Sequence, residues 1–240
     1  EPAVDFVLIS FGVKVLAGGK RRAELQAKEA SAKASVAELE RSLAEAKVAA
    51  LQAQVEPHFL FNTLALIGQL IETNPPEAAR VHQHLIDYLR SALPQMRSGA
   101  SGTLGKQLEL SKAYLAIMQA RMKERLAVRY NVPDFLKSAP FPPMMLQTLI
   151  ENSIKHGLEP KIEGGTIDVN ARVNGATLEV EVCDDGVGID LHADDGVGLA
   201  NIRERLALLY GQDAELVISA PVAGGACATV RIPYKMMEEA

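Results

Sequence analysis

One long stretch constrains the fold more than any other: residues 21–56 contain no glycine or proline. Eleven of these residues are alanine, with six basic and six acidic residues among them. This composition is strongly helical, and a continuous helix here would be about 54 Å long at about 1.5 Å per residue. Apolar residues recur in heptad steps that later shift: Val36, Leu39, Leu43, Ala46 and Ala50, then Val48, Leu51 and Val55. The pattern predicts a two-stranded coiled coil, with an isolated solvent-exposed helix as the alternative.

Helical spacing continues beyond this stretch, through Leu60, Leu64, Ile67 and Ile71. Asn74-Pro75-Pro76 ends that helix, because proline disfavours helical geometry in the residue before it. A second helix is predicted over 77–96, and the short turn between the two predicts an antiparallel hairpin. A loop at 98–102 leads into a third helix over 104–126.

From about residue 127 the pattern changes class. Strands are predicted from alternating apolar residues, helices from their wider spacing, and a hairpin turn from Asn174-Gly175. The predicted order is strand 127–132, helix 144–156, strands 166–173 and 176–183, helix 199–210, and strands 214–219 and 226–232. These elements predict an α+β domain with helices on one face of a sheet. The chain is therefore divided into residues 1–20, helical residues 21–127 and an α+β domain over 128–240.

Charge and cysteine content exclude several classes of protein. The formal net charge of 25 − 30 = −5 argues against a nucleic-acid binder, which needs basic residues to neutralise phosphates. Two cysteines cannot build a disulfide framework or a cysteine-rich zinc module. Cys183 and Cys227 fall on predicted strands and are predicted to be small free thiols, with a redox role as the alternative.

The N-terminal residues 4–17 are mostly apolar, but the run is shorter than the roughly 20 residues of a membrane span. The basic sequence GGKRR follows it, as at the cytoplasmic edge of a truncated span. A short packed helix or strand explains the run equally well, and both interpretations stay open.

The first stretch with chemical potential is Glu56-Pro57-His58-Phe59-Leu60-Phe61-Asn62. Helical steps from His58 reach small or polar residues, namely Asn62, Ala65, Gln69 and Glu72. We therefore expect His58 to face solvent, with a local kink at Pro57. An exposed imidazole suits nucleophilic chemistry near neutral pH, although a single histidine is more often structural.

The second stretch is the predicted helix at 144–156. Its apolar positions bury one side, whereas Glu151, Asn152, Lys155 and His156 project elsewhere. An amide oxygen such as that of Asn152 is a hard ligand that suits Mg²⁺, and Lys155 or His156 could meet phosphate charge. A solvated helix face is the alternative.

Two glycine-rich segments follow, at 184–188 and 194–201. In the first, a strand ends in Asp184 and Gly-x-Gly follows, which lets backbone approach a ligand while a carboxylate accepts hydrogen bonds from an amine. In the second, Gly-x-Gly opens a helix, whose N-terminus favours phosphate. Neither segment is a Rossmann or P-loop fingerprint.

Four of these motifs, in this order, resemble one family of signalling enzymes, and a fifth segment at 114–126 matches it as well. QVEPHFLFNTL resembles the phosphoacceptor box of LytS/YehU-type sensor histidine kinases, and YLAIMQARMKERL resembles the connector of that family. ENSIKHG, DDGVGI and GVGLANIRERL resemble the N, G1 and G2 boxes of a Bergerat (GHKL) ATP-binding domain. The resemblance covers about residues 45–240. It implies an α+β fold in which a coiled-coil and helical-hairpin dimerisation domain precedes a Bergerat-type α/β sandwich.

The resemblance also implies roles for the candidate residues. His58 would be the phosphoacceptor, Asp184 would accept the adenine amine of ATP, and Asn152 would be the Mg²⁺ ligand. Asn62 and Glu151 are further catalytic candidates. The other nucleotide-binding candidates are Lys155, Gly186, Gly188, Gly196, Gly198 and Leu199, with a short lid over 189–195. The implied partners are a second copy of the chain, a response regulator, often with a LytTR DNA-binding output, and the inner membrane. This chain would be the cytoplasmic portion of a protein anchored in that membrane.

Two positions depart from the family pattern. Ala65 stands where the family often has asparagine, and the small side chain should be tolerated. Phe59 follows His58, where many other histidine kinases place an acid that acts as a base. A base would then come from Glu56, Asn62 or the ATP-binding domain, and Asn62 could instead orient a water for phosphohistidine hydrolysis.

The predicted function is ATP-dependent autophosphorylation of His58, followed by transfer to an aspartate of a response regulator. One alternative is a GHKL ATPase that uses ATP for conformational work, with His58 incidental. The other is a non-catalytic dimeric scaffold. His82 and His84 diverge on their helix and are not expected to share a metal, and His192 is expected to be solvated.

Overall fold

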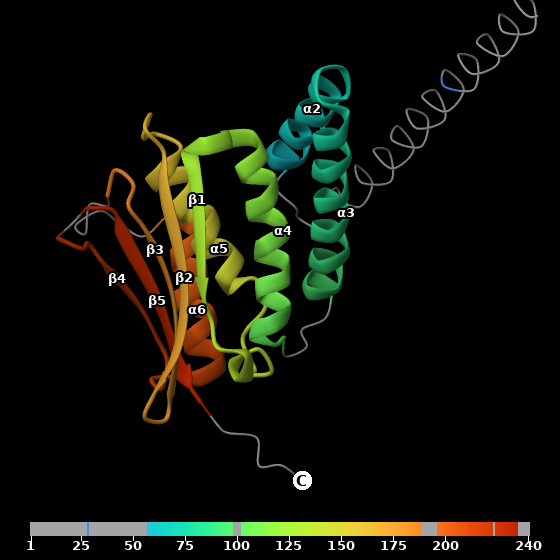
Figure 1. Cartoon of the computed structure of the whole chain (residues 1–240). Coiled ribbons are helices and arrows are strands. Elements are labelled where there is room, and N and C mark those ends of the chain that lie inside the picture. Colours follow the sequence, from blue (N-terminus) through green and yellow to red (C-terminus); the bar gives the residue numbers. More distant parts are fainter. Residues whose placement is uncertain (1–27, 29–56, 98–101, 189–195, 223, 235–240) are drawn as a thin grey trace, which may run out of the picture. The chain divides into compact units, whose positions relative to one another are not determined.

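The computed structural model describes residues 28, 57–97, 102–188, 196–222 and 224–234 (Figure 1). The coiled coil predicted over 21–56, the interpretation of residues 4–17 and the lid with His192 therefore lie outside the described residues, apart from Lys28, which is helical. Within the described ranges, no helix combines the length and the apolar character needed to cross a bilayer.

The described part begins with the three predicted helices. α2 (Pro57–Thr73) packs against α3 (Pro75–Arg97), and α3 packs against α4 (Leu104–Met122). Asn74 lies between the first two, and its carbonyl oxygen accepts two backbone hydrogen bonds from the start of α3. The predicted hairpin is confirmed. α4 ends earlier than predicted because Lys123 adopts a φ of 56°, outside helical geometry.

Five strands form one mixed sheet in the order β1-β2-β3-β5-β4. β1 pairs in parallel with β2, and every other neighbouring pair is antiparallel. The strands are β1 (Leu126–Asn131), β2 (Gly165–Asn174), β3 (Thr177–Asp184), β4 (Glu215–Ser219) and β5 (Ala226–Pro233). The predicted hairpin at Asn174-Gly175 joins β2 to β3, with Gly175 at a φ of 60°.

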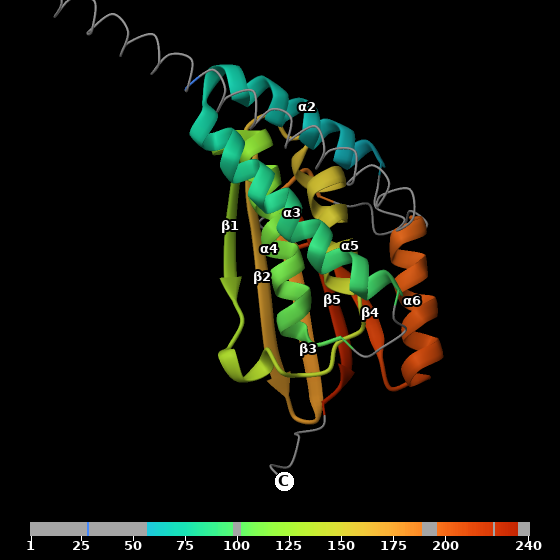
Figure 2. The same ribbon diagram turned by 90° about the vertical axis from the view of Figure 1, so that its right-hand side faces the viewer.

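Helices cover one face of this sheet (Figures 1 and 2). They are α4, α5 (Met145–Asn152) with its π-helical continuation η3 (Ser153–Leu158), and α6 (Val197–Tyr210). Short 3-10 turns, η1 (Lys123–Arg125) and η2 (Asp134–Leu136), flank β1. Strand residues of the covered face form the core with the helices, among them Ile167, Val169, Leu178, Val180, Val182, Val230 and Ile232. The α+β architecture is as predicted.

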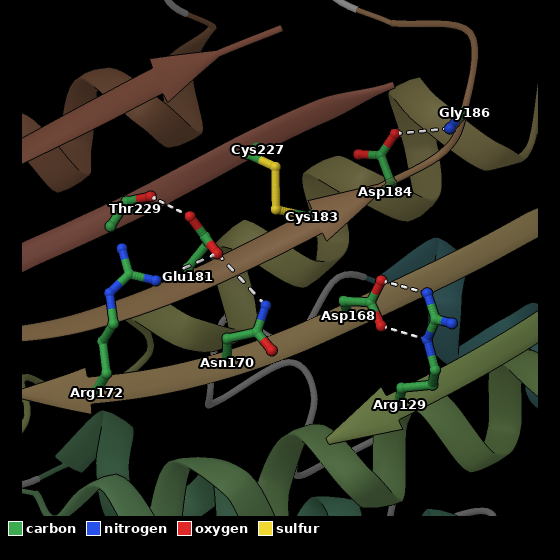
Figure 3. The surroundings of a disulfide bond; sticks show 10 residues. All are labelled: Arg129, Asp168, Asn170, Arg172, Glu181, Cys183, Asp184, Gly186, Cys227 and Thr229. Carbon is green, nitrogen blue, oxygen red and sulfur yellow. Dashed lines mark hydrogen bonds and ion pairs between the residues drawn. A yellow bond between two sulfur atoms is a disulfide. The ribbon is translucent and has the colours of Figure 1, made fainter. Parts of the chain in front are cut away.

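The opposite face of the sheet is polar and carries a ladder of cross-strand pairs (Figure 3). Arg129 donates two hydrogen bonds to the Asp168 carboxylate, at 2.5 and 2.7 Å. Further along, cross-strand contacts join Asn170 to Glu181, Glu181 to Thr229, Arg172 to Glu179 and Arg231 to Glu215. Polar residues therefore alternate with the apolar core residues, as in a sheet with one solvated face.

The prediction that Cys183 and Cys227 are free thiols is wrong. The two side chains form a disulfide on the polar face, between β3 and β5 (Figure 3). The strand register pairs them directly, with Cα atoms 4.1 Å apart. Directly opposed residues of an antiparallel pair place their side chains side by side on one face. The cysteines lie 44 residues apart in the chain, so no local pattern reveals this pairing.

Candidate active site

β3 ends at Asp184, whose side chain is almost completely buried, with 7% of the residue exposed. Its Oδ1 atom accepts a hydrogen bond from the backbone N–H of Gly186 at 3.0 Å (Figure 3). Burial raises the pKa of Asp184, and hydrogen bonds from Gly186, Ser153 and Ala226 work against that rise. A buried carboxylate with spare acceptor positions can take a hydrogen bond from an amine.

The helix that begins as α5 reaches this carboxylate through its π-helical continuation, η3. At Ser153 the α-helix gives way to the π-helical turn η3, a feature often found at functional sites. A Cβ atom added to Gly157 would lie only 2.5 Å from Asp184 Oδ1. The Gly157 carbonyl oxygen accepts from the N–H of Val187 at 3.0 Å, and a Cβ on Gly186 would collide with the Gly157 backbone. The predicted N-box and G1 motifs therefore contact each other through backbone atoms, at Gly157 and Gly186.

The start of α6 packs against the same helix. A Cβ added to Gly198 would lie 3.2 Å from Cγ2 of Thr148 and 3.5 Å from the amide atoms of Asn152. Gly196 occupies the N-cap position, and a glycine has no side chain with which to cap the helix. Free N–H groups at such a terminus attract anions. Asn152 therefore lies beside a helix N-terminus.

The remaining candidates surround this group. Glu151 is half-buried, and its Oε1 accepts a hydrogen bond at 2.8 Å from Nε2 of the fully buried Gln147. Lys155 is exposed on η3, and Leu199 is half-buried on α6. Gly188 has a φ of 87°, a conformation that favours glycine. The structure thus brings the N-box, G1 and G2 motifs onto neighbouring elements.

His58 and Asn62 form a second group, on the first turns of α2. His58 is exposed, as predicted, and the Asn62 side-chain nitrogen lies 3.3 Å from Nδ1 and 3.2 Å from Nε2 of the ring. The next two residues, Phe59 and Leu60, are buried at 5% and 1% exposure. The imidazole therefore projects into solvent, while the two residues that follow it fix this turn of α2 to the core.

Aromatic packing holds the His58 turn in place. The Phe59 ring lies 5.2 Å from Tyr88 of α3 and 4.9 Å from Tyr114 of α4, measured between ring centroids. The two tyrosine rings also contact each other, at 6.0 Å. Such aromatic clusters stabilise a fold beyond the effect of the area that they bury. This cluster therefore holds α2, α3 and α4 together at the turn that carries His58.

Sequence reasoning missed several residues of the site. Gly157 stood in the N-box motif but received no role, and its close approach to Asp184 depends on the π turn. Gln147, which holds Glu151, looked like an ordinary polar residue on an amphipathic helix. Gly225 packs its backbone against that of Asp184, and the pair Gly224-Gly225 was the available signal.

The described ranges contain one group of His, Cys, Asp and Glu side chains close enough together to hold a metal ion, formed by Glu181 with the two disulfide-bonded cysteines. His82 and His84 do not belong to it. Asn152, the Mg²⁺ ligand that the resemblance implies, is not one of these four residue types, and its role stays a prediction.

The chain matches two family models in succession. Residues 46–126 match the Histidine kinase family, and residues 140–236 match the Histidine kinase-, DNA gyrase B-, and HSP90-like ATPase family. Together the two matches cover most of the chain.

Relatives named LytS are about one third identical to the chain over the aligned residues. Sensor protein LytS of Oceanobacillus iheyensis is 34% identical over 195 residues, which cover 75% of this chain and 33% of that protein. Sensor protein LytS of Bacillus subtilis is 33% identical over 210 residues, which cover 82% and 35%. The chain thus spans about a third of the length of the curated relatives that it matches.

A solved structure is also similar. The histidine kinase domain of the Erythrobacter litoralis EL346 blue-light activated histidine kinase superposes with a TM-score of 0.44 at 19% identity, over 82% of this chain and 93% of that one. The two family matches and the LytS relatives agree with the order of the four motifs and with the α+β fold. The chain belongs to the histidine kinase family, with a Histidine kinase region followed by an ATPase domain of the gyrase B and HSP90 type.

Proposed function

We propose that this chain is the kinase portion of a two-component sensor, which transfers a phosphoryl group from ATP to His58 and then to an aspartate of a response regulator. The observation that carries the proposal is the convergence at Asp184: Gly157 and Gly186 approach its carboxylate, while Gly198 approaches Asn152 on the same helix. Three separate motifs of a nucleotide site then lie on adjoining elements.

The surroundings of Asp184 fit an adenine base. The carboxylate is buried, and beyond its hydrogen bonds from Gly186, Ser153 and Ala226 it retains one of its about four acceptor positions. A side chain at Gly157 or Gly186 would overlap backbone or carboxylate atoms. In our proposal the carboxylate accepts the exocyclic amine of adenine, and the bare backbone lets the flat base approach.

The start of α6 and the exposed end of the N-box helix fit the phosphates. The backbone N–H groups that follow the N-cap glycine Gly196 and the exposed ammonium group of Lys155 both favour negative charge. Gly188 and Leu199 would line the cavity beside them. Asn152 offers an amide oxygen next to Gly198, which suits a magnesium ion that keeps water and phosphate oxygens as its other ligands. When bound, Mg²⁺ would offset phosphate charge during transfer.

The acceptor chemistry rests on the exposed ring of His58. One ring nitrogen attacks the γ-phosphorus with its lone pair, the bond to the β-phosphate oxygen breaks, and ADP leaves. The Asn62 amide lies within reach of both ring nitrogens. When its oxygen accepts the ring N–H, the other nitrogen keeps its lone pair free for the attack. Glu151, held by Gln147, is the proposed base for the ring proton.

The partners follow from this chemistry. The phosphoryl group leaves His58 for an aspartate carboxylate of a receiver domain, for which we propose a response regulator of the LytTR output type. The helical region around α2 and α3 is the proposed dimerisation domain, and residues 128–240 are the proposed catalytic domain. We place this portion in the cytoplasm, attached to the inner membrane through its N-terminal side.

The test is incubation of the full chain with ATP that is radiolabelled on its γ-phosphate. The proposal expects acid-labile label on the wild-type protein, no label on His58→Gln, and normal labelling of the matched control His84→Gln, which changes a histidine on α3. Asp184→Asn should lose both nucleotide binding and label. Nucleotide consumption without retained label would contradict the proposal in favour of a simple ATPase, and absence of nucleotide binding would favour a scaffold.

A further inference from the structure

The disulfide between Cys183 and Cys227 lies outside the machinery described above, yet it is next to it in the chain. Cys183 directly precedes Asp184, and Cys227 directly follows Ala226. The sulfur atoms lie on the polar face of the sheet, whereas the Asp184 carboxylate bonds to Gly186 at the end of β3 (Figure 3). The bond therefore ties β3 to β5 one residue away from the proposed adenine acceptor.

The strand register makes this connection direct. Asp184 pairs with Ala226, the last pair of the β3–β5 ladder, and the preceding pair is the two cysteines. The backbone N–H of Ala226 donates a hydrogen bond to the Asp184 carboxylate. Gly225, just before it, packs closely against the Asp184 backbone. The start of β5 thus supports the carboxylate, and the disulfide holds that start in place.

We propose that Cys183 and Cys227 form a reversible oxidation site, which exchanges with low-molecular-weight thiols and their disulfides, and that its oxidised state favours nucleotide binding at Asp184. The inference rests on the proposed nucleotide site. In the cytoplasmic setting that we propose, a disulfide is more often a redox sensor than a permanent structural bond.

The exchange is balanced by two equivalents of a small thiol. Its thiolate attacks the sulfur of Cys183, which is half-buried, and displaces Cys227, which is buried, as a thiolate that takes a proton. A second small thiolate attacks the mixed disulfide on Cys183 and releases the protein thiol together with the oxidised small molecule. Both protein sulfurs end as thiols, and the two electrons come from the small thiols.

The sheet keeps the site reversible. After reduction the ladder bonds of β3 and β5 still hold the two cysteines opposite each other, so oxidation needs no search for the partner. The Glu181 carboxylate has an oxygen within 4.8 Å of both sulfurs. The thiolate that begins reduction comes from the attacking small molecule, because both protein sulfurs are held in the disulfide.

Loss of the bond should affect the end of the ladder first, because Asp184 and Ala226 are its terminal pair. A strand end that opens part of the time reduces the fraction of molecules able to bind nucleotide. We expect the Kd for nucleotide to rise about three- to tenfold on reduction, in proportion to that fraction.

The experiment uses the full chain equilibrated with mixtures of reduced and oxidised glutathione. Alkylation and mass spectrometry give the disulfide fraction, and calorimetry with a non-hydrolysable ATP analogue gives the Kd at each end of the range. We expect the disulfide to titrate reversibly, with tighter nucleotide binding in the oxidised protein. Cys183→Ser and Cys227→Ser should show the weaker Kd in every mixture, and circular dichroism should show both variants folded.

Three results would overturn the inference while leaving the proposed function standing: the same Kd in the reduced and oxidised protein, a cysteine pair that never changes state across the range, or serine variants that remain redox-sensitive. Zinc bound by the reduced protein, with an unchanged Kd, would overturn it in favour of a metal site. Absence of nucleotide binding in both states would overturn the proposed function and the inference together.

Discussion

Gly157 offers the sharpest test of the nucleotide site, because a single methyl group there would press on Asp184. In Gly157→Ala the new Cβ would lie 2.5 Å from Oδ1 and 2.8 Å from Cγ of Asp184. Ordinary van der Waals contact begins at about 3.4 Å, so the carboxyl group has to withdraw by about 0.9 Å, the difference between 3.4 Å and 2.5 Å.

The displacement predicts a large loss of nucleotide affinity and a small change of stability. A charge-assisted hydrogen bond contributes about 1.5–3 kcal/mol, so losing the one to adenine raises the Kd for ATP roughly 10- to 150-fold. Alanine is a better helix former than glycine by about 1 kcal/mol, which offsets part of the steric cost to the fold. Calorimetry with a non-hydrolysable ATP analogue and urea denaturation measure the two effects.

Gly68→Ala is the matched control. Gly68 lies within α2, and a Cβ added there meets nothing within 4 Å. The change should raise the free energy of unfolding by about 0.5–1 kcal/mol and leave the Kd for nucleotide unchanged. A folded Gly157→Ala protein whose Kd stays within about twofold of the wild-type value, a difference of about 0.4 kcal/mol, would refute our assignment of the Asp184 carboxylate.

Two further predictions concern stability. Burial raises the pKa of Asp184 in the folded chain, so its protonated form is favoured by folding; this contribution is complete below the ordinary carboxyl range and is lost as pH rises through the raised pKa. The free energy of unfolding of the wild type, minus that of Asp184→Asn, should therefore increase as pH falls from 7 toward 4, and a flat difference in urea titrations would contradict this. Reduction of the Cys183–Cys227 bond, which closes a loop across 44 residues, should lower the free energy of unfolding by up to about 4 kcal/mol, and Cys227→Ser should show no such response to a reductant in the same titrations.

Local signals predicted most of the elements. Consecutive prolines after Asn74 ended one helix and began the next, and Asn174-Gly175 placed the hairpin of β2 and β3. Both signals depend on backbone preferences of a few adjacent residues, which act in the same way in any context. For that reason the predicted boundaries lie within a few residues of the observed ones along most of the described chain.

Part of the candidate site could also be predicted from local motifs, and part of it could not. The order of the motifs and their resemblance to a nucleotide-binding domain named Asn152, Asp184 and Gly198 as candidates for one site, and in the structure Gly198 approaches Asn152. The π-helical turn that brings Gly157 against Asp184 has no comparable signal, since its six residues are compatible with an ordinary helix. The disulfide escaped prediction for another reason: it depends on which strands pair and in what register, which is set by the whole sheet.

Phe59 stands in the position where many histidine kinases have an acid. The fold determines what an acid at this position could do in this chain. The Phe59 ring is 5% exposed between Tyr88 and Tyr114, so this position points into the core while His58 points to solvent. An acid here would be buried among aromatic rings and would not reach the imidazole. We therefore expect Phe59→Glu to destabilise the chain by more than about 3 kcal/mol, since it removes a core aromatic and buries a charge, and to supply no base.

Phe59→Leu is the control for this change. It keeps an apolar side chain at the buried position and should remain folded, with its free energy of unfolding lowered by about 1–2 kcal/mol and His58 still labelled by ATP. Thermal unfolding and the radiolabel assay measure both variants. If Phe59→Glu folded normally and labelled faster than the wild type, the side chain would have to turn toward His58. The base would then be a local residue, and Glu151 would lose its proposed role.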